Sequence, residues 1–213
     1  MKTIRWGMIG CGDVTEVKSG PGFYKADHST LLAVTNRTLD KAYDYAQRHG
    51  VARVYPDATA LLADPEIDAV YIATPPAGHK ALTLQAAAAG KHVYVEKPMA
   101  LSETECEQMI AACQAAGVRL FVAYYRRAMP RFLQVKQWLE QGAIGAICSV
   151  SVWQRQQPAP EELSRDTLPW RLRAEVAGGG KFLDVGVHQL DLLDFLFGPI
   201  VDVHGEAVNR AGH

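Results

Sequence analysis

The stretch Val93-Tyr94-Val95-Glu96-Lys97-Pro98 decides how the rest of the chain is interpreted. Its apolar residues are typical of a buried parallel strand, and Ser102-Glu103-Thr104-Glu105 has the capping pattern of a helix start. Lys97 therefore stands where a strand ends, which is the ligand-binding edge of an open α/β sheet. Buried lysines readily change their protonation state, so Lys97 is a candidate for chemistry. Pro98 restricts the backbone of the turn behind it.

Short apolar runs alternate with amphipathic stretches throughout residues 1–123. This alternation predicts an α/β fold, with a doubly wound parallel sheet. The expected strands are 4–9, 31–35, 53–55, 68–73, 93–95 and 118–123, and the expected helices are 13–17, 39–49, 58–63, 83–89 and 102–116. We expect Ser19-Gly20-Pro21-Gly22 to break the first helix early.

The pattern changes after residue 124, and an incomplete α+β C-terminal domain is expected over 124–213. Two helices and two strands are predicted there, at 131–141, 178–197, 147–154 and 200–208. Two strands make a poor sheet on their own, so this domain looks unfinished. An unpaired sheet edge is a template for pairing, and we expect the chain to form a homo-oligomer.

The composition is that of an ordinary globular protein, with 213 residues, 48% hydrophobic and 21% charged. A net charge of −1 without a basic patch argues against nucleic acid as a partner. No apolar run approaches the length needed to span a bilayer, which argues against a membrane partner. The N-terminus leads straight into a strand, so a cytoplasmic location is expected.

The four cysteines are Cys11, Cys106, Cys113 and Cys148. Their spacing matches neither zinc sites nor redox motifs. We expect reduced thiols in the core.

Gly10-Cys11-Gly12 follows the first expected strand. The first glycine permits a tight turn, and the second lets a pyrophosphate approach the start of the next helix, at Asp13 and Val14. Thr15 stands where the dinucleotide-binding pattern has its third glycine. Such residues can also form an ordinary strand–helix turn, but their place after the first strand favours dinucleotide binding.

The end of the second expected strand bears on the choice of nucleotide. It reads Thr35-Asn36-Arg37-Thr38, with no carboxylate before Asp40. An acidic residue at this place binds ribose hydroxyls, whereas an arginine accommodates a 2′-phosphate. Asn36 and Arg37 therefore favour NADP over NAD as the cofactor. The alternative is that Arg37 is a solvated loop residue.

Asp184 and His188 are four residues apart, a spacing that places both on one face of a helix. A histidine can take the proton from a hydroxyl while hydride leaves the carbon. The aspartate would orient the histidine or bind the substrate, and Lys97 would hold the substrate oxygen. Two alternatives are a metal site that includes Asp191 and a polar helix face with a structural role.

Together these motifs resemble the Gfo/Idh/MocA oxidoreductase family. The motifs that carry the resemblance are Gly10-Cys11-Gly12, Thr74-Pro75-Pro76 with His79, Glu96-Lys97-Pro98, and Gly178-Gly179-Gly180 followed by Asp184 and His188. They extend over essentially the whole chain. The resemblance implies an NAD(P)-binding Rossmann domain over 1–123 and a partial substrate and dimerisation domain over 124–213.

The resemblance also implies roles for particular residues. The implied catalytic set is Lys97, Asp184 and His188, and the Lys97–Pro98 bond is expected to be cis. The residues implied to lie along the cofactor are Thr74, Pro75, His79, Glu96 and Lys97. Those implied to contact cofactor or substrate are Arg126, Trp170 and Arg171.

The implied activity is hydride transfer between NADP or NAD and a sugar, cyclitol or related secondary alcohol or carbonyl. Family members are longer, with further strands in the second domain, so we expect a C-terminally truncated chain or one completed by association. The alternative function is a nucleotide-binding relative without turnover. The presence of Lys97, Asp184 and His188 favours the enzyme, whereas the early end of the chain favours the alternative.

Overall fold

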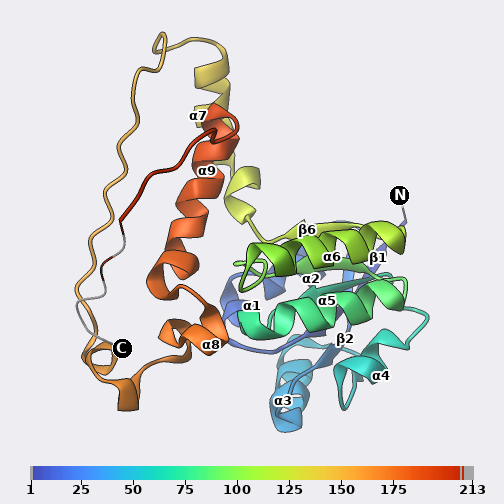
Figure 1. The fold of residues 1–213 in the computed structure, drawn as a ribbon. Helices are drawn as coiled ribbons and strands as arrows, with labels where there is room; N and C mark the ends of the chain where they lie inside the picture. Colours follow the sequence, from blue (N-terminus) through green and yellow to red (C-terminus); the bar gives the residue numbers. More distant parts are fainter. Residues whose placement is uncertain (1, 207, 209–213) are drawn as a thin grey trace. The chain divides into compact units, whose positions relative to one another are not determined.

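The computed structural model describes residues 2–206 and 208 (Figure 1). The chain forms two compact units, Met1–Ala123 and Tyr124–His213, and each is described by itself.

The first unit is built on a six-stranded parallel sheet in the order β3-β2-β1-β4-β5-β6. Its strands are β1 (Ile4–Ile9), β2 (Ser29–Thr35), β3 (Arg53–Val54), β4 (Ala69–Ile72), β5 (His92–Val95) and β6 (Leu120–Val122). Its helices are α1 (Asp13–Val17), α2 (Gly20–Lys25), α3 (Leu39–His49), α4 (Ala58–Leu62), α5 (His79–Ala88) and α6 (Glu103–Ala115). This confirms the predicted α/β fold class and gives the strand order of the doubly wound dinucleotide-binding fold, with its switch point between β1 and β4.

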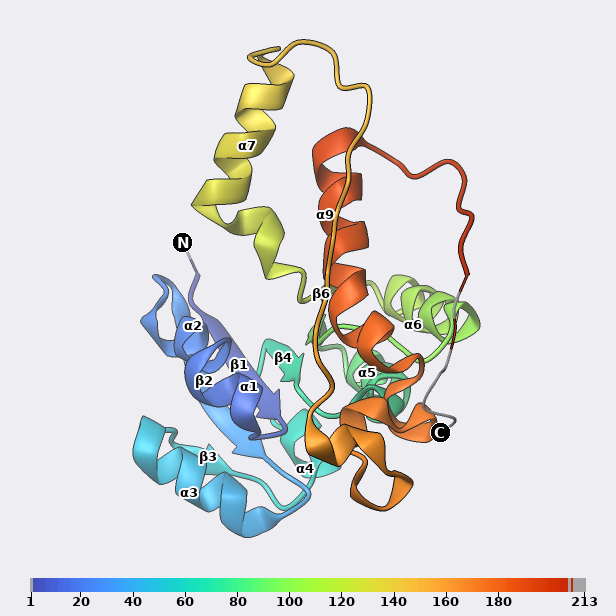
Figure 2. The same cartoon turned by 90° about the vertical axis from the view of Figure 1, so that its left-hand side faces the viewer.

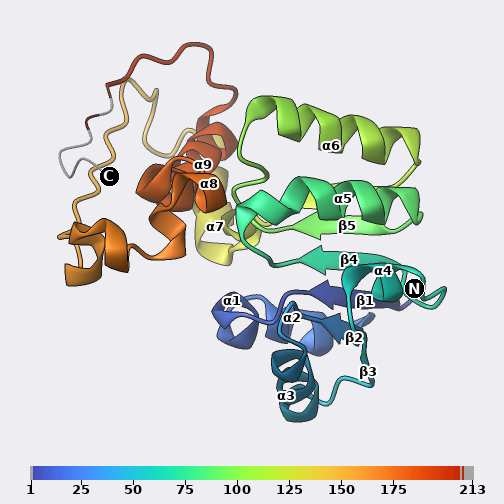
Figure 3. The ribbon, with the colours of Figure 1, turned by 60° about the horizontal axis from the view of Figure 1, so that its bottom comes forward.

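Helices cover the two faces of this sheet, as Figure 3 shows. Successive strand residues point to opposite faces, so Met8 packs in one core cluster and its neighbour Ile9 in another. The cluster around Ile9 includes residues of α4, α5 and α6, and the cluster around Met8 includes residues of α2 and α3. Because both faces are buried, the strands read as continuous apolar runs in the sequence.

The first helix ends early, as predicted, but the glycine-rich segment that ends it also begins a second helix, which was not predicted. Helix α1 ends at Val17, and α2 begins at Gly20 with Pro21 in its first turn. A Cβ atom at Gly20 would lie 1.8 Å from the main-chain oxygen of Thr15. Glycine is therefore required where the two helices meet.

The second unit consists of helices and extended segments (Figures 1 and 2). Its helical elements are the 3₁₀ turns η2 (Tyr125–Ala128), η3 (Pro160–Leu163), η4 (Arg165–Thr167) and η5 (Trp170–Leu172), the helices α7 (Pro130–Glu140), α8 (Ala174–Ala177) and α9 (Val187–Phe197), and the π-helical turn Phe182–Gly186. Helices α7 and α9 lie side by side, and Lys136 Nζ donates to the main-chain oxygen of Phe195 at 3.0 Å.

The two strands predicted for this unit are not formed in its described residues. Residues 147–154 contain no strand, and neither do residues 200–206 and 208. An alternating pattern produces a strand only where a neighbouring strand completes the hydrogen bonds. Neither segment has such a partner among the residues described, so the prediction of two strands is wrong for this structure.

The cysteines are free thiols, but they are not all in the core. Cys11 and Cys113 are buried, Cys106 is half-buried and Cys148 is exposed. Within the described ranges, no helix combines the length and the apolar character needed to cross a membrane.

Candidate functional site

The glycine turn after β1 packs against the neighbouring strand ends. Gly10 has a φ of 102°, and its N–H donates to the main-chain oxygen of Thr35 at 2.8 Å. A Cβ atom at Gly10 would lie 2.9 Å from the main-chain oxygen of Ala73, whereas a Cβ at Gly12 would meet nothing within 4 Å. The turn is therefore closed on its inner side at Gly10 and has open space at Gly12.

This open side faces the start of α1. Gly12 is the N-cap residue, and no side chain within the described part of the chain caps it. The N–H groups that follow, at Asp13 and Val14, are those that this motif offers to a phosphate. Thr15 is fully buried and donates from Oγ1 to the main-chain oxygen of Gly12 at 2.7 Å. The threonine thus closes the turn from within, and the geometry fits a bound pyrophosphate.

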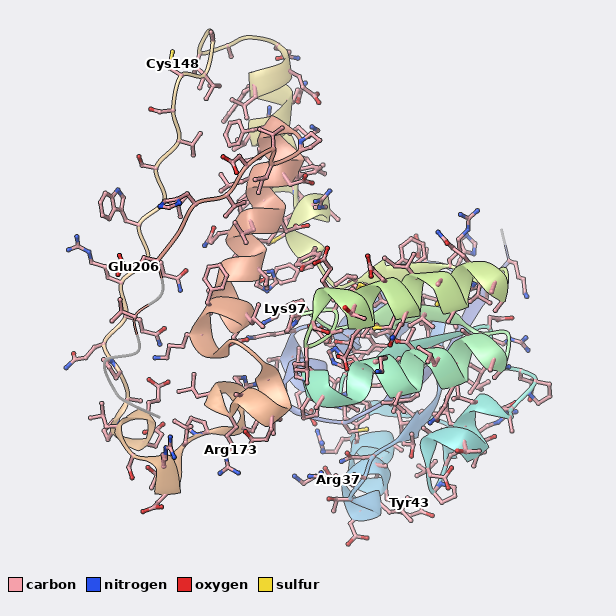
Figure 4. All side chains as sticks on the ribbon, viewed as in Figure 1. Arg37, Tyr43, Lys97, Cys148, Arg173 and Glu206 are labelled. Carbon is pink, nitrogen blue, oxygen red and sulfur yellow. The ribbon has the colours of Figure 1, made fainter. Side chains whose placement is uncertain are left out.

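Asn36 and Arg37 lie directly after β2, on the same edge of the sheet as Gly10. Asn36 is half-buried, and Arg37, labelled in Figure 4, is exposed. Helix α3 begins two residues later at Leu39, so both side chains flank its start. The arginine is accessible to a phosphate group at this edge.

His79 joins two loops of the same edge. Its Nε2 lies 2.8 Å from the main-chain oxygen of Thr74, and its Nδ1 lies 2.9 Å from that of Pro98. The imidazole is fully buried, and this burial lowers its pKa. Its side chain therefore holds together the loop that carries Thr74 and the loop that carries Pro98.

Glu96 and Lys97 follow β5, and the Lys97–Pro98 peptide bond is cis, as expected. The Glu96 carboxylate accepts from the Tyr71 hydroxyl at 2.5 Å and from the main-chain N–H of Lys97 at 3.2 Å. Lys97 is half-buried and is labelled in Figure 4. The lysine is thus held at the end of β5, next to the switch-point strand β4.

Asp184 and His188 lie on one continuous helical stretch of the second unit. Asp184 belongs to the π-helical turn, and His188 is in the first turn of α9. π-Helical turns are rare and often occur at functional sites. His188 is 7% exposed, and the rings of Tyr124 and Tyr125 meet its ring edge-on, with centroids 6.1 and 5.5 Å away.

Arg127, which follows the predicted contact residue Arg126, fixes the elements around His188. Its guanidinium donates to Asp191 Oδ1 at 2.7 Å and to Asp194 Oδ2 at 2.8 Å. Burial raises the pKa of Asp191, and Arg127 opposes that shift. Because Asp191 is bound by arginine, the metal alternative loses a ligand, and no group of three or more candidate ligands occurs in the described ranges.

The other predicted residues of this unit lie in η2 and η5. Arg171 stacks on Trp170, with its guanidinium carbon 4.4 Å from the ring centroid. Arg126 is half-buried beside Arg127. The structure groups the predicted residues by unit, with Lys97 in the first and Asp184 and His188 in the second.

A doubly wound sheet with an open glycine turn next to its switch point is typical of dinucleotide-binding proteins. Comparison with protein families agrees. Residues 4–124 match the oxidoreductase family with an NAD-binding Rossmann fold, and residues 132–213 match the Gfo/Idh/MocA C-terminal domain. The chain belongs to the Gfo/Idh/MocA oxidoreductase family.

Individual relatives are longer than this chain. Oxidoreductase P35 of Formosa agariphila is 43% identical over 94% of the chain, which spans 62% of that protein. KijD10, a 3-ketoreductase from Actinomadura kijaniata solved with NADP and TDP-benzene, is 29% identical with a TM-score of 0.78, over 92% of this chain and 58% of its own. The WlbA dehydrogenase from Bordetella pertussis, solved with NADH and UDP-GlcNAcA, is 34% identical with a TM-score of 0.78, over 93% and 56%.

Proposed function

We propose that the protein is an NADP-preferring oxidoreductase that interconverts a secondary alcohol and a carbonyl on a polyhydroxylated small molecule. One observation carries the proposal: the open turn at Gly12 and the lysine after β5 lie on the same edge of one parallel sheet. That edge is where ligands bind in open α/β sheets. The WlbA structure with NADH and UDP-GlcNAcA supports the cofactor and the substrate class, and the KijD10 structure with NADP and TDP-benzene supports the cofactor.

The roles follow from the chemistry of each side chain. The nicotinamide ring supplies the hydride acceptor or donor when NADP is bound. The Lys97 ammonium holds the substrate oxygen, and His188 accepts the hydroxyl proton while the carbon gives up hydride. Asp184 orients the imidazole. In the reverse direction, His188 returns the proton to the carbonyl oxygen.

The two units divide this work. Residues 1–123 bind the cofactor through the turn at Gly10 and Gly12, and residues 124–213 supply the substrate side and the contacts of a homo-oligomer. The cytoplasm is the proposed location, because its reducing conditions suit four free thiols.

The choice of nucleotide is tested by replacing Arg37. A hydrogen bond to a charged group is worth about 1.5–3 kcal/mol, so Arg37→Ala weakens NADPH binding by roughly 10- to 100-fold. NADH binding stays unchanged. Lys41→Ala removes the same charge from an exposed position on α3 and leaves both affinities unchanged. Fluorescence titration of the parent and both variants with each cofactor measures the dissociation constants, and an equal loss for both cofactors in Arg37→Ala would contradict the role of Arg37.

A second candidate, a cofactor-binding protein without turnover, is favoured by the absence of the predicted strands among the described residues 147–154 and 200–206. Comparison of Lys97→Ala with the parent chain in a screen of sugar and cyclitol substrates separates the two candidates. Loss of proton-transfer catalysis lowers turnover by about 10²- to 10⁴-fold. Equal background rates would favour the binding protein.

A further inference from the structure

A chain of partly buried hydrogen bonds in the first unit has no part in the proposed reaction steps. Its centre is Tyr71 of β4, which is fully buried and packs against the rings of Phe23 and Tyr94, at centroid distances of 4.7 and 5.5 Å. The Tyr71 hydroxyl oxygen lies 2.7 Å from Ser19 Oγ and 2.5 Å from Glu96 Oε1. Ser19 follows the helix of the glycine turn, and Glu96 directly precedes the lysine.

The direction of these bonds follows from the number of protons. Tyr71 and Ser19 have one hydroxyl proton each, whereas an ionised carboxylate can only accept. Tyr71 therefore donates to Glu96. Ser19 Oγ donates to Val14 O at 3.0 Å, and this carbonyl oxygen, which has two lone pairs, also accepts the main-chain N–H of Ser19 at 2.9 Å. The single hydroxyl proton of Ser19 lies between two acceptors, Val14 O and the Tyr71 oxygen. Ser19 therefore joins helix α1 to Tyr71, and Tyr71 joins Ser19 to Glu96.

Tyr71 is suited to act as a permanent donor. Its burial, together with the neighbouring Glu96 carboxylate, raises the pKa of the phenol well above its usual value. The hydroxyl therefore keeps its proton at neutral pH. Its ring is held by the aromatic cluster, so the oxygen has little freedom to leave Glu96.

The other end of the chain fixes the backbone of the lysine. Glu96 Oε1 is occupied by Tyr71, and Oε2 accepts the main-chain N–H of Lys97. With both oxygens bound, the carboxylate links the interior of β4 to the residue that begins the cis-proline turn. Loss of the Tyr71 hydroxyl would leave one Glu96 oxygen without this donor.

We propose that Tyr71 is a positioning residue for Lys97, and that it couples the glycine turn to the lysine through Ser19 and Glu96. A cofactor bound at the glycine turn reduces the mobility of the end of α1. Through the hydrogen bonds of Ser19, Tyr71 and Glu96, it also reduces the mobility of the Lys97 backbone. The inference rests on the proposed function for the role of Lys97 and for the cofactor, but not for the contacts themselves.

The test is amide hydrogen exchange of the whole chain, with and without NADPH. Tyr71→Phe removes the hydroxyl and keeps the ring. Tyr94→Phe is the matched control, because it removes a hydroxyl from the same aromatic cluster but outside the chain of hydrogen bonds. We expect Tyr71→Phe to speed exchange at the Lys97 amide by about tenfold or more, the equivalent of one hydrogen bond to a carboxylate. It also abolishes the protection that NADPH gives this amide, whereas Tyr94→Phe changes neither.

Equal exchange at Lys97 in the two variants would overturn the proposal. If Tyr71→Phe does not fold, Ser19→Ala removes the hydroxyl that joins α1 to Tyr71, and unchanged cofactor protection at Lys97 in that variant would also overturn it. Failure of the parent to bind NADPH would contradict the proposed function and the coupling. The exchange rates without cofactor would still decide whether Tyr71 positions Lys97.

Discussion

At the scale of single residues, the two glycines of the turn have opposite surroundings. Gly10 needs its positive φ and has the Ala73 carbonyl against it, whereas Gly12 has empty space beside its Cα. The sequence motif alone does not distinguish the two glycines. The structure separates a glycine that the backbone requires from a glycine beside open space, where we propose that the pyrophosphate binds.

This difference predicts different outcomes for the same substitution. Gly10→Ala strains the backbone and lowers the free energy of unfolding by about 1–3 kcal/mol. Gly12→Ala changes stability by less than about 0.5 kcal/mol, as an exposed substitution does. Its methyl group fills the space for the pyrophosphate, so NADPH binding weakens by about tenfold or more. Urea unfolding and fluorescence titration of both variants check this, and equal loss of stability in the two would contradict it.

Sequence reasoning found the residues whose signal is local and missed those defined by distant partners. Gly10, Gly12 and Lys97 stand at strand ends in recognisable motifs. Tyr71 reads only as one more apolar member of a buried strand, because Ser19 and Glu96 approach it through the fold. The role of Arg127 likewise depends on its hydrogen bond to Asp191, which is 64 positions away in the chain.

At the scale of elements, an ion-pair cluster ties α1 to α3. Arg48 of α3 binds both oxygens of Glu16 in α1, at 2.7 and 2.8 Å. His49 Nε2 lies 2.9 Å from Glu16 Oε2. The hydrogen bonds from Arg48 are the main cause that lowers the pKa of Glu16 to about 2. The cluster therefore holds the helix that carries the open turn.

The lowered pKa of Glu16 predicts a pH-dependent contribution to stability. Because the folded carboxyl ionises more readily than the unfolded one, its contribution is complete above pH 4.5 and is lost as pH falls through about 2. Glu16→Gln lowers the free energy of unfolding at pH 7 by about 0.5–1 kcal/mol, since solvent screens the pair. Thermal unfolding at pH values from 7 to 2 tests this, because the free energies of unfolding of parent and variant should become equal as the pH falls.

Asp44→Asn is the control for this prediction. Asp44 also binds Arg48, but both residues belong to α3. Asp44→Asn lowers the free energy of unfolding by about 0.3–0.5 kcal/mol and leaves the ion pair between α1 and α3 intact. A stability difference between parent and Glu16→Gln that stays constant down to pH 2 would contradict the assignment.

The strands of the first unit were predictable because burial on both faces makes them apolar throughout. The predicted helices of that unit were found with ends shifted by a few residues, and α5 begins at His79, where the turn Pro76–Gly78 leads into it. The strands predicted at 147–154 and 200–208 need neighbouring strands to form, and the alternation of apolar and polar residues does not show whether such neighbours exist. The π-helical turn left no signal in residue spacing.

At the scale of the whole molecule, the second unit exposes apolar side chains on extended segments. Val201 is 96% exposed, Val203 is 77% exposed and Trp153 is 80% exposed. Extended segments with apolar side chains and available main-chain groups are templates for pairing. The exposed surface therefore supports self-association independently of the strands predicted from the sequence.

We expect the isolated chain to self-associate, with an apparent mass in light scattering that rises with concentration. Replacing Val201 and Val203 together by lysine places like charges on the segment and reduces the association. Tyr43→Lys makes a similar change on α3, at a side chain that is 56% exposed, and leaves association unchanged. A monomeric parent across the concentration range would contradict the prediction.

The π-helical turn at Phe182–Gly186 makes the register between Asp184 and His188 depend on one surplus residue. Such a turn is an α-helix with a single insertion. Deleting Val185 would restore α-helical winding and bring Asp184 and His188 from four residues apart to three. Residues three apart on an α-helix still share a face, so the carboxylate would stay on the side of the imidazole but move by about 1.5 Å along the helix axis, which a crystal structure of the deletion variant would reveal. In this helix, a length change of one residue alters the spacing of the two side chains without any change in either residue.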